Sequence, residues 1–223
     1  GVDAVRPITV GGEDVLVEPD SAAAWQTLAT TLADVAARTV EVYRTCCDEV
    51  LRTVLERRPA DAPLRVFSLH DTMNTKMRAD GAIVVERAPA DRLPLWANLG
   101  NKGDAQGNAQ DDPITLDGAE LRRIAAAWGD GFGLQGAARD EQILLNRPYK
   151  GAYETVHYGA RLRTLGQPRV GAVQVEFLRE TLLGAAAVTR LHTPGTDWPA
   201  VDEAHIAGIA AALARAGQAL RAG

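Results

Sequence analysis

A histidine and a glutamate, each set in an apolar run, are the residues of this chain best suited to chemistry. His70 follows the mostly apolar residues 65–69, and small polar residues come directly after it. Glu176 lies within a second apolar run, residues 170–177. An imidazole nitrogen binds metal ions, and a carboxylate surrounded by apolar groups has a raised proton affinity. These are the parts of a metal-assisted hydrolase, with His70 as a metal ligand and Glu176 as general base.

Both residues also have a purely structural interpretation. A lone histidine after a strand can be a hydrogen-bonded core residue, although Asp71, Thr72 and Asn74 could orient its ring. A buried carboxylate is costly unless it is paired, so Glu176 could instead form an ion pair with Arg179. The residue pattern leaves both alternatives open.

Residues 146–155 form a third cluster, in which cations and phenols stand at a strand-to-loop transition. Arg147 and Lys150 supply positive charge, and Tyr149 and Tyr153 supply hydroxyl groups. An arginine can hold a carboxylate through two parallel hydrogen bonds, and a tyrosine can donate to a developing oxyanion. The same composition also fits a surface turn with solvated charges.

The elements that must position these residues alternate between strand and helix patterns. Residues 22–57 carry apolar side chains at a spacing near 3.6, which predicts a long amphipathic helix on a sheet, capped by Ser21 and broken near Thr39. Further strands are expected at 65–70, 142–145 and 170–177. Further helices are expected after a cap at Thr115 or Asp117 and at 199–222. Residues 8–17 predict a hairpin. We therefore expect one domain, a three-layer α/β/α sandwich around a mostly parallel mixed sheet.

The composition of the chain argues against nucleic-acid binding and against a membrane-spanning helix. The net charge is −5, aromatic residues make up 5%, and no basic block is present, which argues against nucleic-acid binding. No apolar run reaches the roughly 20 residues that a membrane-spanning helix needs. Cys46 and Cys47 are adjacent in a helical pattern and cannot easily bridge to each other. Two reduced thiols fit a cytoplasmic protein.

The ordered set of motifs resembles the N-formylglutamate amidohydrolases, a family related to the zinc carboxypeptidases. The matching pieces run over residues 64–181 and keep the family's order. They are His70-Asp71, Leu99-Gly100 with its glycine-rich loop, Asn146-Arg147-Pro148-Tyr149-Lys150-Gly151-Ala152-Tyr153, Tyr158-Gly159 and Gln174-Val175-Glu176-Phe177-Leu178-Arg179.

The resemblance implies a zinc amidohydrolase with His70 as a metal ligand and Glu176 as general base. It places Asn146, Arg147, Lys150 and Tyr153 around the pocket of a small substrate that carries a carboxylate. Residues 2–7 resemble another motif of the family, which makes Arg6 a candidate clamp for that carboxylate.

The chain also departs from the family pattern. The family's early Pro-His-x-Gly motif and a further acidic ligand have no counterpart here, whereas catalytic zinc needs three protein ligands and an open position. Either an N-terminal segment of the family is missing from this sequence, or the site is degenerate, or it uses other ligands. Asp71 replaces a serine and Ala152 replaces a glycine, so the substrate can differ from formylglutamate.

Three functional hypotheses follow. The first is hydrolysis of the amide bond of an N-formyl or N-acyl amino acid. The second is a carboxypeptidase or an amidase acting on peptidoglycan peptides. The third is a non-catalytic binding module on the same fold, because fold does not fix function. The substrate, the full ligand set and the oligomeric state are not specified by the sequence.

Overall fold

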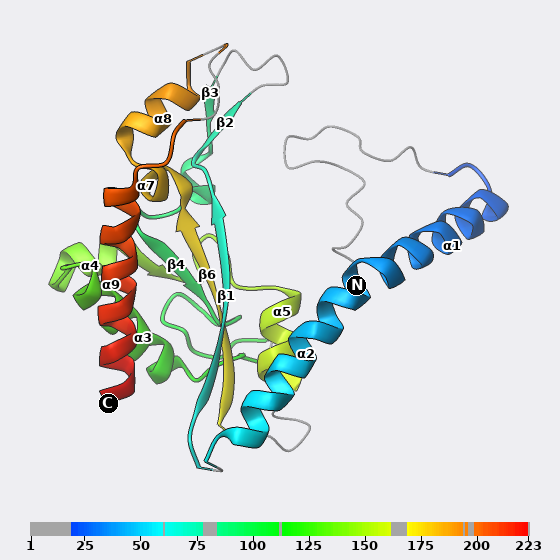
Figure 1. The fold of residues 1–223 in the computed structure, drawn as a ribbon, viewed down its shortest axis with the longest axis horizontal. Coiled ribbons are helices and arrows are strands. Elements are labelled where there is room, and N and C mark those ends of the chain that lie inside the picture. Colours follow the sequence, from blue (N-terminus) through cyan, green and yellow to red (C-terminus); the bar gives the residue numbers. More distant parts are fainter. Residues whose placement is uncertain are drawn as a thin grey trace. The chain divides into compact units, whose positions relative to one another are not determined.

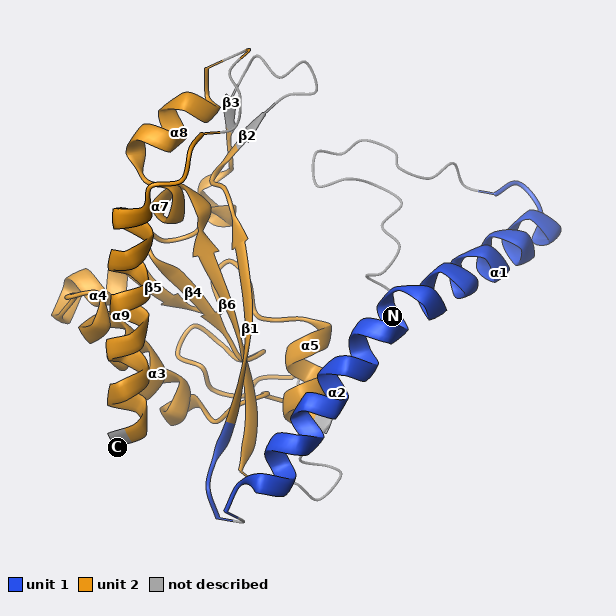
Figure 2. Ribbon diagram, in the orientation of Figure 1, with its two compact units in different colours: residues 1–64 blue, residues 65–223 orange. Residues whose placement is uncertain are grey.

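The structure is a computed structural model that describes residues 19–59, 61–77, 84–111, 113–161, 169–193, 195 and 199–222. The chain forms two compact units, residues 1–64 and residues 65–223 (Figure 2). Every site residue predicted from position 70 onward belongs to the second unit, while Arg6 and the predicted hairpin lie outside the described residues. The expectation of a single domain stays a prediction.

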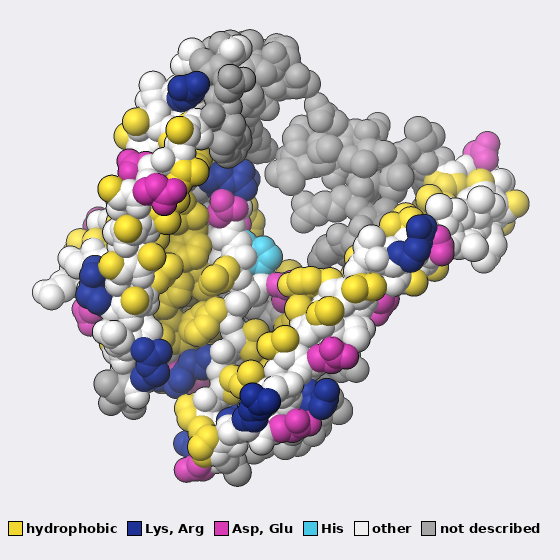
Figure 3. Space-filling view, viewed as in Figure 1, with side chains coloured by type: hydrophobic (Ala, Val, Ile, Leu, Met, Phe, Trp, Pro, Cys, Tyr) yellow, Lys and Arg dark blue, Asp and Glu magenta, His cyan; other side chains and the backbone are white. Residues whose placement is uncertain are grey.

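The described part of the first unit is helical. It consists of α1 (Ala22–Arg38) and α2 (Val40–Arg57), which meet at Thr39 (Figure 1). Ser21 caps α1 by accepting a hydrogen bond from the backbone N–H of Ala24 at 3.2 Å. The predicted cap and break are thus confirmed. Neither helix buries a residue, and large apolar side chains such as Tyr43 and Val50 are exposed. Figure 3 shows hydrophobic side chains along the surface of both helices.

The second unit is built on a four-stranded mixed sheet with the strand order β1-β6-β4-β5 (Figure 1). Strand β4 pairs in parallel with β5 and antiparallel with β6. The strands are β1 (Leu64–Thr72), β4 (Ala97–Gly100), β5 (Ile143–Leu145) and β6 (Val170–Leu178). A separate antiparallel pair consists of β2 (Thr75–Met77) and β3 (Val84–Glu86).

Helical segments complete the second unit. They are η2 (Pro89–Asp91), α3 (Gly118–Gly131), α4 (Gly136–Gln142), α5 (Tyr153–Thr155), η3 (Val156–Arg161), α7 (Arg179–Leu183), α8 (Ala185–Leu191) and α9 (Glu203–Ala222). None of the helices in the described part of the chain is long and apolar enough to cross a membrane. The predicted α/β class is confirmed at this level.

The core lies between one face of the sheet and the helices α3 and α9. Asp117 caps α3 by accepting hydrogen bonds from the N–H groups of its first turn, and Leu121, Ile124 and Trp128 of α3 are buried. They pack with Val173, Val175 and Phe177 of β6, with Ala97 and Leu99 of β4, and with Ala216 of α9. Burial of these apolar side chains is the main force that holds the sheet and helices together.

Candidate functional site

The opposite face of the sheet is polar, because successive side chains of a strand point to opposite faces. Val175 and Phe177 point into the core, so Gln174 and Glu176 point to the other side of β6. Asn98 of β4 is paired with Glu176 and also lies on this side. Helix α5 and the π-helical turn η3 pack against β6, and they cover part of this polar face.

Strand β1 adds Ser68 and His70 to the same face. Phe67 contacts Trp128 in the core with ring centroids 6.3 Å apart, and Arg65 forms an ion pair with Glu120 of α3. Residues 68 and 70 therefore point away from α3, toward the side that carries Glu176. The two predicted residues thus come from neighbouring strands and share one face of the sheet.

The ends of β1 and β6 are tied together beside this face. Arg179, the first residue after β6, donates hydrogen bonds to both carboxylate oxygens of Asp71 at 2.8 and 3.0 Å. Glu180 accepts hydrogen bonds from the backbone N–H groups of Asn74 and Thr75 at 2.7 and 3.1 Å. Arg179 therefore pairs with Asp71, and the structural alternative of a Glu176–Arg179 hydrogen-bonded pair does not occur.

Glu176 is a buried acid with few partners. Its residue is 8% exposed, and its side chain accepts one hydrogen bond from Gln174 at 2.9 Å. Burial raises the pKa of the Glu176 carboxyl above its ordinary value, while the hydrogen bond from Gln174 and the charge of His70 offset part of that rise. A carboxylate with a raised pKa is a better proton acceptor at neutral pH.

His70 belongs to a cluster that the sequence did not reveal. Its Nε2 lies 2.7 Å from Ser68 Oγ and 3.6 Å from Glu154 Oε2, and the Ser68 hydroxyl donates to Glu154. Ser68 Oγ thus lies within hydrogen-bond distance of both side chains, and the tautomer of His70 decides whether Nε2 donates to Ser68 or accepts from it. The side chains of His70 and Glu154 are 45% and 36% exposed, so ligands can reach them.

Arg87 brings a cation to the same face. It follows β3 and donates hydrogen bonds to the Tyr149 hydroxyl at 2.6 Å and to the Thr72 hydroxyl at 2.9 Å. Its charge lowers the pKa of Glu176, although less than burial raises it. The Arg87 Nε is buried and has no hydrogen-bond partner in the described part of the chain. A buried donor of this kind is costly unless something accepts from it.

Asn146 is placed differently from its predicted role. Its side-chain amide donates to Asn101 Oδ1 at 2.8 Å and to the Asp104 carbonyl at 2.6 Å, and its Oδ1 accepts from the Asn101 N–H at 2.9 Å. The residue is buried and its φ is +54°, a backbone conformation that asparagine tolerates better than most residues. Asn146 thus holds the glycine-rich loop in place.

The backbone at Lys150 and Gly151 comes close to the end of β4 at Gly100. A Cβ on residue 100 would lie 2.7 Å from the carbonyl carbon of Lys150, so only glycine allows the two backbone segments to approach this closely. The Lys150 carbonyl then accepts a hydrogen bond from the N–H of Lys102 at 2.7 Å. These contacts fix the segment that carries Tyr149 and Glu154 over the polar face.

The other predicted substrate residues are dispersed. Lys150 is exposed and donates to Gln110 at 3.3 Å. Tyr153 stacks on His157 with ring centroids 5.4 Å apart. Arg147 lines a cavity beside β5, away from Glu176. The structure therefore groups His70 and Glu176 but does not gather Asn146, Arg147, Lys150 and Tyr153 around them.

A catalytic zinc ion would need three protein ligands. In the described residues no group of three or more His, Cys, Asp and Glu side chains is placed to hold a metal ion. His70 Nε2 and Glu154 Oε2 are 3.6 Å apart, which is close to the roughly 3.3 Å between two tetrahedral zinc ligands at 2.0–2.1 Å from the ion. The described residues thus fit two ligands of the three.

Sequence reasoning missed Ser68, Glu154 and Arg87. Ser68 carried a usable signal, because a residue two positions before His70 in a strand must share its face. Glu154 and Arg87 reach the site only through tertiary packing, and no local spacing indicates them.

Comparisons of the chain with protein-family models, with curated proteins and with solved structures found no match.

Proposed function

We propose that this chain is a hydrolase that cleaves the amide bond of a small N-acyl amino acid, with a divalent metal ion as cofactor. The observation that carries the proposal is the buried Glu176 carboxyl, whose pKa is raised by burial, on the same sheet face as His70 and Arg87. An acid, an imidazole and a cation with an unpaired donor form a set suited to amide hydrolysis.

Glu176 is the general base of the proposed reaction. Its carboxylate takes a proton from water while the water oxygen bonds to the carbonyl carbon of the amide. The C–N bond then breaks, and Glu176 returns the proton to the leaving nitrogen. The products are a carboxylic acid, which is formate for an N-formyl substrate, and a free amine. A base of this kind typically contributes a factor of about 10²–10⁴ to the rate.

Arg87 is the proposed anchor for the substrate carboxylate. Tyr149 and Thr72 each accept from one terminal nitrogen and hold the guanidinium in place, which leaves the second N–H of each terminal nitrogen to donate to a substrate carboxylate. Charge-assisted hydrogen bonds of arginine to carboxylates are stronger than neutral ones. Arg87 therefore takes the role that the sequence had suggested for Arg6, Arg147 or Lys150.

His70 and Glu154 are the side chains that would hold the metal ion. A bound ion would polarise the amide carbonyl and lower the pKa of a bound water to about 7. Ser68 contacts both side chains and fixes their spacing. This role needs a further ligand, which the described residues do not supply.

The proposal is tested by measuring both the binding of a metal ion and the release of the reaction product. Zinc binding is measured by calorimetry, and formate release is measured with N-formyl derivatives of acidic and neutral amino acids. Glu176→Gln should lower the rate by about 10²-fold or more while zinc binding persists. His70→Ala and Glu154→Gln should weaken zinc binding, and Arg87→Gln should raise KM for substrates that carry a carboxylate.

His205→Ala is the matched control, because His205 bonds to the Thr181 carbonyl at 2.8 Å and is not part of the polar face. It should leave both zinc binding and rate unchanged. A wild-type chain that binds no zinc and releases no formate would overturn the proposal and favour the non-catalytic interpretation. Cleavage of C-terminal residues from peptides, without formate release, would favour the carboxypeptidase hypothesis.

A further inference from the structure

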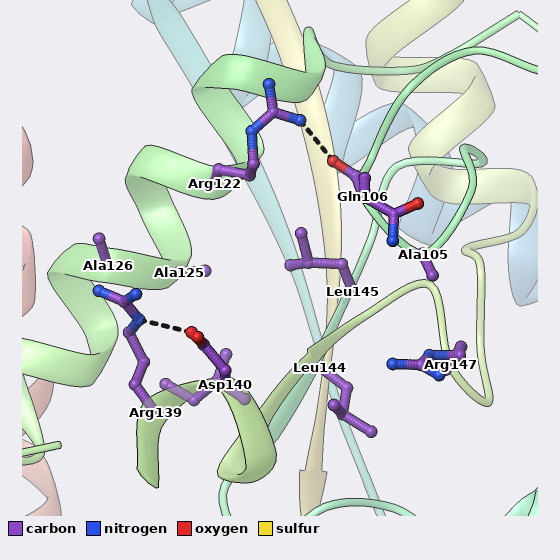
Figure 4. A pocket seen from close by; sticks show the side chains of 11 residues that line it. Ala105, Gln106, Arg122, Ala125, Ala126, Arg139, Asp140, Leu144, Leu145 and Arg147 are labelled. Atoms are coloured by element: carbon purple, nitrogen blue, oxygen red, sulfur yellow. Dashed lines mark hydrogen bonds and ion pairs between the residues drawn. The ribbon is translucent and has the colours of Figure 1, made fainter. Parts of the chain in front are cut away.

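A cavity lies at the edge of the sheet that is formed by β5. It has a volume of about 420 Å³ and is lined by β5, α3, α4, the glycine-rich loop and Arg147 (Figure 4). This volume lies in the range of about 300–1,000 Å³ that is typical of small-molecule sites.

The cavity has an apolar floor. Leu144 and Leu145 of β5 and Ala125 and Ala126 of α3 line it, and the two leucine side chains point to opposite sides of this edge strand (Figure 4). Leu144 and Leu145 are only partly buried, so a ligand that covered them would remove apolar surface from water.

The rim of the cavity is positively charged. Arg122, Arg139 and Arg147 line it together with one acid, Asp140, although the whole chain has a net charge of −5. Arg122 donates to the Gln106 carbonyl at 2.5 Å, and Arg139 forms an ion pair with Asp140 at 3.1 Å. These partners hold the two arginines in place.

Arg147 is the arginine available to a ligand. Within the described residues, no hydrogen bond or ion pair engages its guanidinium group, and Figure 4 shows the side chain directed into the cavity. A planar guanidinium with open donors can bind a carboxylate through two parallel hydrogen bonds.

Leu144 shares the sheet face of Glu176, but the cavity lies at the β5 edge of the sheet and Glu176 does not line it. Asn98 lies between Glu176 and Leu144 in the strand register. Its side chain donates to the Tyr149 carbonyl and accepts from the Tyr149 N–H, both at 2.9 Å. The backbone of Tyr149 therefore covers Asn98 on β4, the strand that lies between Glu176 on β6 and the cavity beside β5.

We propose that the cavity beside β5 is a binding site for a small organic carboxylate with an apolar body. The carboxylate pairs with Arg147, and the apolar body lies along the edge of β5, beside Leu144 and Leu145. Arg122 and Arg139 add long-range attraction without losing their own partners. The site is independent of the proposed hydrolase centre.

Octanoate is the probe, and octanol is its neutral counterpart. Binding is measured by calorimetry and by methyl NMR of the leucine side chains. Octanoate should bind and shift the methyl signals of Leu144 and Leu145, whereas octanol should bind at least tenfold more weakly. Equal binding of the two probes would overturn the proposal, because the rim charge would then play no part.

Variants locate the site. Arg147→Gln should weaken octanoate binding about tenfold or more, because a hydrogen bond to a charged group contributes about 1.5–3 kcal/mol. Asp140→Asn should tighten binding, since it removes the one acid of the rim. Ala126→Leu should block the cavity. Arg92→Gln, which alters an exposed arginine that pairs with Glu86, should leave binding unchanged.

Thermal unfolding of each variant shows whether it is folded, and a folded Arg147→Gln protein with unchanged affinity would refute the assignment. Glu176→Gln separates this inference from the proposed function. It should leave octanoate binding intact, and a loss of binding in that variant would place the probe at the Glu176 face instead.

Discussion

Asn98 is the cross-strand neighbour of Glu176, yet it gives Glu176 no hydrogen bond. The two residues are direct partners in the antiparallel pair of β4 and β6, but both polar atoms of the Asn98 amide are bound to the backbone of Tyr149. Gln174 is therefore left as the hydrogen-bond donor to the Glu176 carboxylate. This arrangement explains why burial dominates the pKa of Glu176 and raises it.

The first prediction is that Glu176→Gln stabilises the fold at neutral pH. Because the folded state raises the pKa of Glu176, protonation favours folding, and this contribution is lost as pH rises through the folded value. Gln is neutral at every pH, so the unfolding midpoint of the variant should exceed that of the wild type at pH 8. The two midpoints should converge at pH 4.

Thermal melts over this pH range test the prediction. The matched control is Glu141→Gln, which alters an exposed acid on α4 and should give the same small shift at every pH. A Glu176→Gln protein that is less stable at pH 8 than the wild type would show that the carboxylate has stabilising partners.

The second prediction concerns Asn146. Replacing it with Ala removes two donated hydrogen bonds and leaves the buried N–H of Asn101 without its acceptor. Each unsatisfied buried polar group costs about 1–3 kcal/mol, so we expect a loss of at least that size in the free energy of unfolding, measured in urea. Gln135→Ala should change it by less than about 0.5 kcal/mol, because Gln135 is exposed and forms no side-chain capping bond.

The strands expected at residues 65–70 and 170–177 could be predicted from the sequence because their pattern is local, although β1 continues to Thr72 and β6 to Leu178. An apolar run that ends in polar residues indicates a buried strand, and both runs form strands at the predicted places. The alternation of side chains then puts Glu176 on the face opposite the apolar core. In the same way, the break at Thr39 followed from the unusual length of the helical pattern.

The roles of Asn146 and Arg147 could not be read in this way. The order of the motifs predicts that the segment with Asn146 and Arg147 lies near the site. The direction of each side chain, however, depends on the path of a loop that is fixed by contacts with residues distant in the sequence. Asn146 turns toward Asn101, and Arg147 turns toward the cavity beside β5. Glu154 meets Ser68 across 86 positions of sequence, a separation that no local spacing can indicate.

The third prediction is that Gly100→Ala displaces the backbone around Lys150, in the segment that lies over the polar face. Its new Cβ would lie 2.7 Å from the carbonyl carbon of Lys150, where backbone rather than a flexible side chain must move. Overpacking of this kind costs about 1–3 kcal/mol. We expect a lower midpoint in urea and faster proteolysis at Lys150.

Gly208 is the matched control, and its substitution by alanine should have the opposite effect on stability. Gly208 lies within α9, and a Cβ there meets nothing within 4 Å. Gly208→Ala should therefore raise the free energy of unfolding by up to about 1 kcal/mol, because alanine favours helix more than glycine does. Destabilisation by both substitutions would mean that the close approach at Gly100 is not the cause of its effect.

The fourth prediction concerns Asp71, whose pKa is lowered mainly by its hydrogen bonds from Arg179. A lowered folded pKa means that the pair contributes stability above the ordinary pKa of aspartate and loses it as pH falls. The two side chains are 40% and 38% exposed, so solvent screens the pair. Asp71→Asn should therefore cost less than about 1 kcal/mol at pH 7.

A double-mutant cycle with Arg179→Gln isolates the pair, because the coupling should be present at pH 7, should decrease as the pH falls below the ordinary pKa of aspartate, and should be weaker in 1 M salt. Glu86→Gln, which affects an even more exposed pair with Arg92, should show less coupling. The contact of Arg179 Nη2 with the Asp71 backbone carbonyl at 3.3 Å is present in both backgrounds and cancels in the cycle. A coupling that persisted in acid would therefore mean that the protonated Asp71 side chain still accepts a hydrogen bond from Arg179. In that case the ends of β1 and β6 would be joined by neutral hydrogen bonds, and the strand ends beside His70 would stay together at every pH.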